Sequence, residues 1–365
     1  ELRPPPPPAP VELGEVVVTA APPVGLRDGA GRSLLDPEAL TRVTGLSTTE
    51  AVSALSPTVD STRQGAGRNK LFVRGLADSA MNGPVQATVG QYFGELRLSS
   101  GSPHPDLALV DVRRIEVFEG PQGSRFGAGS IGGVVRVTPE PPVHGEWSGR
   151  FGAGVSATSG GAPGSDAAVV VNLPLGGEAA LRAVAWGGRE GGFLDNPSLG
   201  LRAPDHVDTA GGRASVRWRA GGWTLDLHAI AQQVEGADAQ TTPAGAPGNR
   251  STRVREPYAS DFALAGATAA GDLGDLRVTA AVSLSRQGLE ERFDATGAHD
   301  AGPVVVDRRQ TAETLSAELR LEGGGGGGWR WSAGAVLAAG ETVVKRRRRE
   351  AEAPPAAAVG ADLGR

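Results

Sequence analysis

Histidine is the main candidate metal ligand in this chain, which has five histidines and no cysteine. None of the five has a helical partner at the spacing of metal ligands. His206 and Asp208 could hold a weak ion, although a solvated loop is the simpler interpretation. Gly127 to Gly132 fits the G-x-G-x-x-G dinucleotide pattern but leads into the strand-like run 134–137. No G-x-S-x-G elbow or P-loop occurs, so we expect no enzyme, metal or cofactor.

The composition excludes further classes of protein. A net charge of −5 argues against a nucleic-acid binder, and the lack of cysteine excludes a disulfide framework. The sequence contains no run of about 18 apolar residues, so no transmembrane helix is predicted. A membrane barrel is not excluded, because its strands are short and alternate in polarity. No basic-then-apolar leader opens the chain, so we expect any export signal to have been removed.

The N-terminal segment carries one short β-type run between prolines. Pro4 to Pro8 should be extended and exposed, and Pro22-Pro23 follows the run. One interpretation is a disordered tail. The other is an edge strand offered to another protein by β-augmentation. The run consists of Glu15, Val16, Val17, Val18, Thr19 and Ala20.

Residues 34–139 have the pattern of a compact α+β domain. A helix is expected from Asp36-Pro37-Glu38, and a capping box at Ser47 to Glu50 precedes a second helix at 51–55. Strands are expected at 71–74, 115–118 and 134–138, separated by polar, glycine-rich loops at 61–70 and 81–105. A linker is expected at 139–142.

From residue 145 onward the strand candidates alternate strictly between apolar and polar positions, as in 223–232 and 315–321. This is typical of antiparallel strands with one wet face, and it gives about nine strands. Short glycine-rich turns alternate with long polar loops at 188–207, 236–257 and 295–308, as in an outer-membrane barrel. The tryptophans at the short-turn ends would form an interfacial girdle: Trp147, Trp218, Trp223, Trp329 and Trp331.

The run Lys345 to Arg349 follows the last strand candidate, and strand parity places it outside. It could contact lipopolysaccharide phosphates or simply be a solvated strand end.

The stretch DVRRIEVFEGPQGSRFGAGSIGGVVRVT, residues 111–138, resembles the end of the plug domain of TonB-dependent outer-membrane receptors. The run 15–20 looks like the TonB box of that family. Two charges, at Arg113 and Glu119, are reversed relative to the usual family pattern. The residues that carry the plug resemblance are Arg74, Gly75, Ile115, Glu116, Gly120, Pro121, Gly123, Gly127, Gly132 and Gly133.

The resemblance implies an N-terminal extension with a TonB box at 1–33, a plug domain at 34–140 and a partial β-barrel at 145–365. The implied fold is an α+β plug domain followed by antiparallel transmembrane β-barrel strands. The implied function is energy-coupled uptake of a scarce nutrient across the outer membrane of a Gram-negative bacterium, with a ferric siderophore as first candidate. The implied partners are TonB, outer-membrane lipid and lipopolysaccharide. Loop position alone suggests ligand contacts or structural roles for Arg63, Arg68, Gln91, Tyr92 and Phe93.

Three alternatives stay open on the sequence. A passive porin or adhesin-type barrel would lack the plug and the TonB peptide, and a soluble enzyme would leave the loop asymmetry unexplained. A non-functional truncated receptor is the third, because nine strands is odd and below the roughly 22 of plugged transporters. The terminus at 361–365 also lacks an aromatic residue. We therefore expect this chain alone to form no working transporter, and insertion into liposomes as a protease-resistant monomer would contradict that.

Overall fold

The computed structural model describes residues 31–35, 46–77, 85–98, 101, 103–242, 248–297, 302–324 and 329–351. The expected TonB-box run at 15–20 and the helix expected from Asp36 lie outside these residues. The described chain contains a five-stranded sheet, a two-stranded sheet and a nine-stranded sheet. Residues 31–139, which contain the two smaller sheets, are called the plug below, and the nine-stranded sheet is called the wall.

The plug sheet has the strand order β1-β6-β7-β4-β5, with β4 parallel to β7 and the other neighbours antiparallel. β2 and β3 pair separately. The sheet begins at Arg32, slightly ahead of the boundary expected at residue 34. The plug elements are β1 (Arg32–Leu35), η1 (Thr49–Ala51), α2 (Val52–Leu55), β2 (Val59–Ser61), β3 (Leu71–Val73), β4 (Val89–Phe93), β5 (Leu96–Arg97), β6 (Val112–Glu119), α3 (Gly123–Phe126) and β7 (Gly133–Pro139).

Two local expectations for the plug were wrong. The segment 81–105, expected as a polar loop, contains β4 and β5. Every residue of β4 is buried, so the strand has no polar face and no period-two signal. The capping box is also absent, since no side chain caps η1 or α2. The Glu50 carboxylate instead accepts hydrogen bonds from Ser61 and Asn69, residues of the 61–70 loop.

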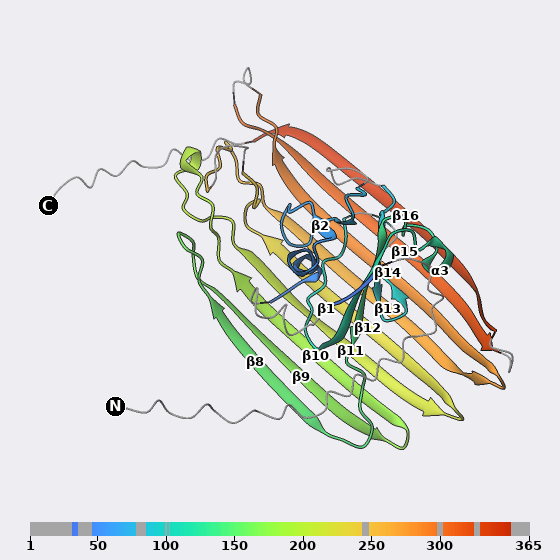
Figure 1. Ribbon diagram of the computed structural model, residues 1–365. Coiled ribbons are helices and arrows are strands. Elements are labelled where there is room, and N and C mark those ends of the chain that lie inside the picture. Colours follow the sequence, from blue (N-terminus) through green and yellow to red (C-terminus); the bar gives the residue numbers. More distant parts are fainter. Residues whose placement is uncertain are drawn as a thin grey trace, which may run out of the picture. The chain divides into compact units, whose positions relative to one another are not determined.

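The prediction of about nine strands in the wall is confirmed. The strands pair antiparallel in sequence order from β8 to β16. Within the described residues β8 and β16 do not pair with each other, so the barrel is not closed. Figure 1 shows the strands side by side from green β8 to red β16. The wall elements are β8 (Ser148–Ser156), β9 (Gly164–Gly176), β10 (Ala179–Glu190), η2 (Pro197–Leu199), β11 (Val207–Ala220), β12 (Trp223–Gly236), β13 (Tyr258–Leu273), β14 (Leu276–Asp294), β15 (Val304–Gly324) and β16 (Arg330–Glu350).

The connections of the wall have the expected asymmetry of length. β11 and β12 are joined by the two residues Gly221 and Gly222, both with positive φ, which a tight hairpin requires. At the other end, residues 191–206 and 237–257 form long connections. Trp218 and Trp223 flank the short turn, and Trp218 is 53% exposed. Trp218 and Trp223 therefore lie at the short-turn end, as expected.

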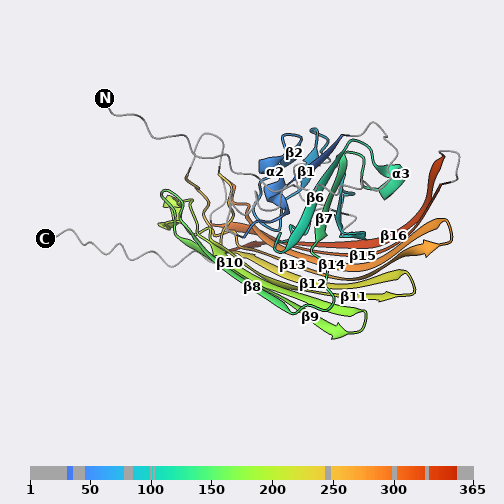
Figure 2. The ribbon, with the colours of Figure 1, turned by 60° about the horizontal axis from the view of Figure 1, so that its bottom comes forward.

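The two faces of the wall differ in what they contact. Figure 2 shows the plug on the concave face of the curved sheet. There Phe93 of the plug shares a buried apolar cluster with Ile230 and Phe262 of the wall. The convex face exposes apolar side chains in the middle of the strands, among them Leu227, Leu284, Leu315 and Leu337. No helix among the described residues is long and apolar enough to cross a membrane.

Candidate functional site

The plug loop 61–70 faces the long-loop end of the wall. Arg63 has a side chain 76% exposed and lies 3.6 Å from Asp60. Arg68, in contrast, is buried: its guanidinium lies 3.9 Å from the centre of the Tyr258 ring and 3.6 Å from Glu291 of the wall. Of the two loop arginines expected as ligand contacts, the structure therefore leaves Arg63 accessible and uses Arg68 to hold the loop to the wall.

Two carboxyl groups hold the same loop to the body of the plug. Glu50 accepts hydrogen bonds from Ser61 and Asn69, and Asp106 accepts one from the Gly67 amide at 3.0 Å. Asp106 also accepts from the Glu50 amide at 2.9 Å, which brings the two acidic residues together. Burial, together with the negative charge of Asp106, raises the pKa of Glu50 from 4.5 to about 7. The loop therefore closes over Glu50, whose carboxyl group has a pKa near neutral pH.

Gln91, Tyr92 and Phe93 lie inside the plug and not in a loop. All three belong to β4 and are 1–2% exposed. The Tyr92 hydroxyl donates to the Phe126 carbonyl at 2.8 Å, and the Phe93 ring packs edge-on against His228 of the wall at 5.6 Å. Their loop position was wrong, because the buried β4 shows no alternation in sequence. A ligand on the plug surface does not reach these side chains in this structure.

One contact between plug and wall is a single carboxylate surrounded by three arginines. Asp111 is fully buried and accepts from Arg182 at 2.6 Å to each oxygen. Arg150 lies 3.2 Å and Arg213 3.5 Å from the same carboxylate. Arg213 also donates to the Asp111 carbonyl oxygen. Because buried pairs with several hydrogen bonds are costly to break from one side, Asp111 anchors the plug to β8, β10 and β11.

Further anchors use wall side chains that reach the plug backbone. Gln232 donates to the Asp106 carbonyl at 2.9 Å and accepts from the Ala108 amide at 2.8 Å. Ser283 donates to the Arg97 carbonyl at 3.0 Å. Sequence analysis missed Gln232 and Asp111 as contacts. In the sequence Gln232 is only a polar residue on the inward-facing side of a strand, and Asp111 is only the acidic residue that begins the plug motif. Neither feature indicates which residue the side chain contacts.

The residues that carry the plug resemblance have structural roles. Arg74, at positive φ, binds Glu119 through its Nε at 3.0 Å and Nη2 at 2.8 Å, so the unusual acid at 119 is paired within the plug. Gly133 has φ +155°, and a Cβ there would collide with the Phe118 carbonyl. Gly127 has φ +70° and lies against Val336 of β16. The G-x-G-x-x-G run, residues 127–132, lies between α3 and β7.

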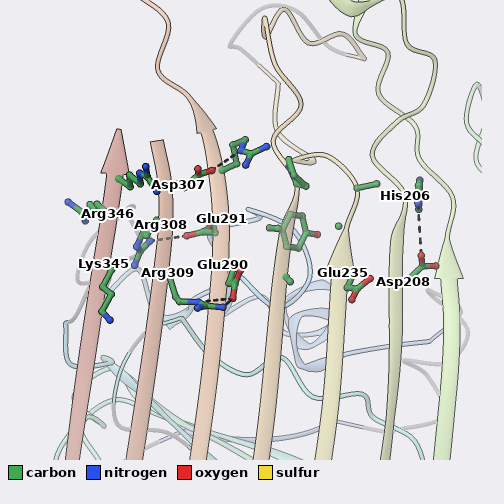
Figure 3. A pocket seen from close by; sticks show the side chains of 17 residues that line it. His206, Asp208, Glu235, Glu290, Glu291, Asp307, Arg308, Arg309, Lys345 and Arg346 are labelled. Atoms are coloured by element: carbon green, nitrogen blue, oxygen red, sulfur yellow. Dashed lines mark hydrogen bonds and ion pairs between the residues drawn. The ribbon is translucent and has the colours of Figure 1, made fainter. Parts of the chain in front are cut away.

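A cavity of about 710 Å³ lies at the long-loop ends of β11–β16. Figure 3 shows the ion pairs that line it, Glu290 with Arg309 and Glu291 with Arg308. Lys345 to Arg349 does not follow the last strand but lies within β16, so its side chains alternate between the two faces. Lys345 pairs in register with Arg309, on the convex face, and Arg346 with Arg308, on the concave face.

The outer connections form a second, polar cavity of about 360 Å³. Arg250 cross-links them: it donates to the Thr241 carbonyl at 2.8 Å and binds Glu256. Among the described residues, no group of three or more His, Asp or Glu side chains is arranged to hold a metal ion, and His206 with Asp208 makes only a pair. The two residues lie 4.0 Å apart as an exposed pair.

Comparison with known proteins agrees with this arrangement. Residues 28–134 match the family model of the TonB-dependent receptor plug domain. The fold is similar to that of the ferric yersiniabactin uptake receptor FyuA from Yersinia pestis, with 13% identity over 88% of this chain and 50% of that chain, at a TM-score of 0.70. It is also similar to the pyoverdine outer membrane receptor FpvA from Pseudomonas aeruginosa, with 15% identity over 89% of this chain and 48% of that chain, at 0.66.

A third similar structure, the copper transporter OprC, has 15% identity over 86% of this chain and 46% of that chain, at a TM-score of 0.64. The chain thus spans about half the length of these solved structures. At such identities the structures establish the fold, and the match at 28–134 establishes the kind of domain. Residues 28–134 therefore match the TonB-dependent receptor plug domain, and the chain has the fold of these solved structures over about half of their length.

Proposed function

We propose that the protein takes part in energy-coupled uptake of a scarce nutrient across the outer membrane. The observation that carries the proposal is a folded plug docked, through buried ionic contacts such as Asp111 with Arg182, on the inner face of an outwardly apolar wall. A passive porin would need no such plug.

The outer membrane is the proposed location because of the convex face of the wall. On β14 its side chains run Leu276, Val278, Ala280, Val282 and Leu284, and then change to Arg286 and Glu290. Nine residues of strand cover about 27 Å, close to the height of an outer-membrane apolar band once the strand tilts. Lys345 and Arg347, on the same face above the band, are proposed to meet lipopolysaccharide phosphates.

The proposed cargo is a ferric siderophore. FyuA and FpvA carry the names of ferric siderophore receptors, whereas OprC is a copper transporter, so copper is the second candidate. Arg63 is the proposed ligand contact that the structure leaves exposed, and a guanidinium suits the anionic oxygens of iron chelates. Gln91, Tyr92 and Phe93 would reach a ligand only after the plug rearranges.

Binding of iron-loaded siderophores or of copper to the purified protein in detergent would separate these cargoes. We expect the iron-loaded siderophore to bind, and to bind more weakly in Arg63→Ala. Asp60→Ala, which removes the neighbouring charge from the same exposed loop, is the control and should bind as well as or better than the parent. Binding of copper but not of iron-loaded siderophores would move the assignment to the second candidate, and binding of neither would contradict the proposal.

TonB is the proposed source of energy, through residues 15–20. The run would add a strand to the TonB C-terminal domain by β-augmentation. A peptide of residues 11–22 should bind that domain in a titration, and Val17→Pro should abolish binding because proline removes a backbone donor. Binding that survives Val17→Pro would count against this contact.

A further inference from the structure

Gln232 is a polar residue in an apolar part of the plug-facing side of β12. Its neighbours on that face, Ile230 and Val234, are 5% and 1% exposed, and each belongs to a buried apolar cluster. Gln232 itself is 5% exposed. Because burial of an amide in apolar surroundings is costly unless the amide is hydrogen-bonded, the partners of this side chain indicate its role.

Both partners of the Gln232 amide are backbone atoms of the plug. Its Nε2 donates to the Asp106 carbonyl at 2.9 Å, and its Oε1 accepts from the Ala108 amide at 2.8 Å. We propose that Gln232 is a positioning residue for the plug loop 61–70: it holds Asp106 in a strained backbone conformation from which the Asp106 carboxylate places the loop. The inference rests on the proposed function, since Arg63 in this loop is the proposed ligand contact. It adds a residue of the wall that determines where this contact lies.

The strain is at Asp106, whose φ is +50°. Aspartate enters the left-handed region more readily than most residues, but the conformation still costs energy and needs support from its surroundings. Asp106 is 2% exposed, so the Gln232 amide and not bulk water satisfies its carbonyl oxygen. Without Gln232 the buried carbonyl would lose this partner, and residue 106 would be free to relax.

The Asp106 carboxylate joins two separate parts of the plug. Its Oδ1 accepts from the Thr49 hydroxyl at 3.2 Å and from the Glu50 amide at 2.9 Å, at the start of the helical turn η1. Its Oδ2 accepts from the Gly67 amide at 3.0 Å. At Gly67 the loop runs against the wall, because a Cβ there would lie 2.8 Å from the Cβ of Ser260. A rotation of Asp106 would therefore move the loop relative to both η1 and the wall.

Hydrogen bonds continue from this carboxylate to the proposed ligand contact. The Glu50 carboxylate accepts from the Ser61 hydroxyl at 3.2 Å, and the Ser61 oxygen accepts from the Arg63 amide at 3.1 Å. The backbone that carries the exposed Arg63 guanidinium is thus connected to Gln232 through Asp106, Glu50 and Ser61. A change at Gln232 should reach Arg63 although the two residues lie in different domains.

Amide hydrogen exchange of the purified protein in detergent tests the positioning role without any ligand. Gln232→Ala should raise the exchange rate of residues 61–70 roughly tenfold, because it removes two hydrogen bonds that hold Asp106. Gln233→Ala is the matched control, since this adjacent glutamine is exposed on the convex face and donates to Glu235. It should leave the exchange of the loop unchanged.

Exchange in β7 separates positioning of the loop from docking of the whole plug. We expect Gln232→Ala to leave β7 as slow as in the parent. Equal acceleration in β7 and in residues 61–70 would mean that Gln232 is only a docking anchor, and it would overturn the proposal. Unchanged exchange of the loop in Gln232→Ala would overturn it as well.

Two variants of Asp106 test the strain. Asp106→Gly and Asp106→Ala both remove the carboxylate, so both should speed the exchange of residues 61–70. Only Asp106→Ala keeps a side chain that disfavours a φ of +50°, so Asp106→Gly should unfold at the higher temperature. A higher midpoint in Asp106→Ala would contradict the strained conformation.

Binding of iron-loaded siderophores connects the positioning role to the proposed ligand contact. Gln232→Ala should weaken binding no more than Arg63→Ala does, and the double variant should bind as Arg63→Ala alone, because the two changes remove one contact. Additive losses would contradict action through Arg63. If the parent binds no iron-loaded siderophore, the proposed cargo fails, while the exchange experiment still decides whether Gln232 positions the loop.

Discussion

Glu50→Gln tests whether an acidic pair controls closure of the exposed plug loop. The Glu50 carboxylate accepts from Ser61 and Asn69, and Asp106 accepts from Gly67 and from the Glu50 amide. A glutamine keeps one acceptor oxygen for Asn69, and its amide nitrogen can donate to the Ser61 hydroxyl oxygen. The substitution therefore removes the charge of Glu50 and preserves the shape of its side chain.

The magnitude follows from the pKa of Glu50, which burial and Asp106 raise from 4.5 to about 7 in the closed loop. Each tenfold change in proton affinity is worth about 1.4 kcal/mol, so the closed loop should lose about 3 kcal/mol of stability on ionisation. Below about pH 4.5 the carboxyl is protonated in both states, and no penalty applies. As the pH rises from 4.5 to 7 the open loop ionises first, and closure weakens until the penalty is complete above about pH 7.

Amide hydrogen exchange of residues 61–70, corrected for the intrinsic effect of pH, measures this opening. We expect faster corrected exchange at pH 8 than at pH 5 in the parent and a flat profile in Glu50→Gln. Asp60→Asn is the matched control, because it neutralises an exposed carboxylate beside the same loop and should leave the parent profile unchanged. A flat profile in the parent, or an equal slope in Glu50→Gln, would refute the reasoning.

Three further substitutions probe the interior. Asp111→Asn should weaken docking of the plug by about 3–5 kcal/mol, because it leaves buried arginines without their carboxylate. Limited proteolysis in urea measures the stability of docking. Asp226→Asn is the control, because Asp226 pairs within the wall, and it should not alter docking. Gln91→Leu should raise stability to thermal unfolding by about 1 kcal/mol, because both amide atoms of Gln91 are buried with no partner among the described residues, and a lower midpoint would contradict this. Gly133→Ala should cost about 1–3 kcal/mol in the same assay, since its φ is +155° and a Cβ would meet the Phe118 carbonyl; an unchanged midpoint would argue against strain.

The wall was predictable because each of its strands separates two different environments. Leu227 faces outward and His228 faces inward, and this alternation repeats along β12. It arises because successive side chains of a strand point to opposite faces of the sheet, and here the outer face is apolar while the inner face packs against the plug. Glycine pairs such as Gly221-Gly222 mark the short turns, since both residues need positive φ. Local sequence therefore determined the number of strands and the end at which the tryptophans lie.

The plug interior was not predictable in the same way. β4 is buried on both faces, so Gln91 and Tyr92 show no alternation of polar and apolar residues. Glycines at positions 90 and 94, before Gln91 and after Phe93, also make the segment look like a loop. The anchors depend on pairs far apart in sequence: Asp111 and Arg213 are 102 residues apart. A motif places Asp111 at the start of β6, but only the docked fold determines which arginines surround it.

The ion pairs of the plug differ in exposure, so salt should act on them unequally. The Arg32 side chain on β1 is 34% exposed, whereas the arginines at Asp111 and Glu95 in the wall are 3–14% exposed, apart from Arg150. Mobile ions screen exposed pairs over about 8 Å at physiological ionic strength and act much less on buried ones. Raising the salt concentration from about 0.05 to 0.5 M should therefore speed amide hydrogen exchange in β1 and leave exchange in β7, which carries the buried Arg136, nearly unchanged. Equal acceleration in both strands would mean that the buried ion pairs are as accessible to mobile ions as Arg32, and the argument would fail.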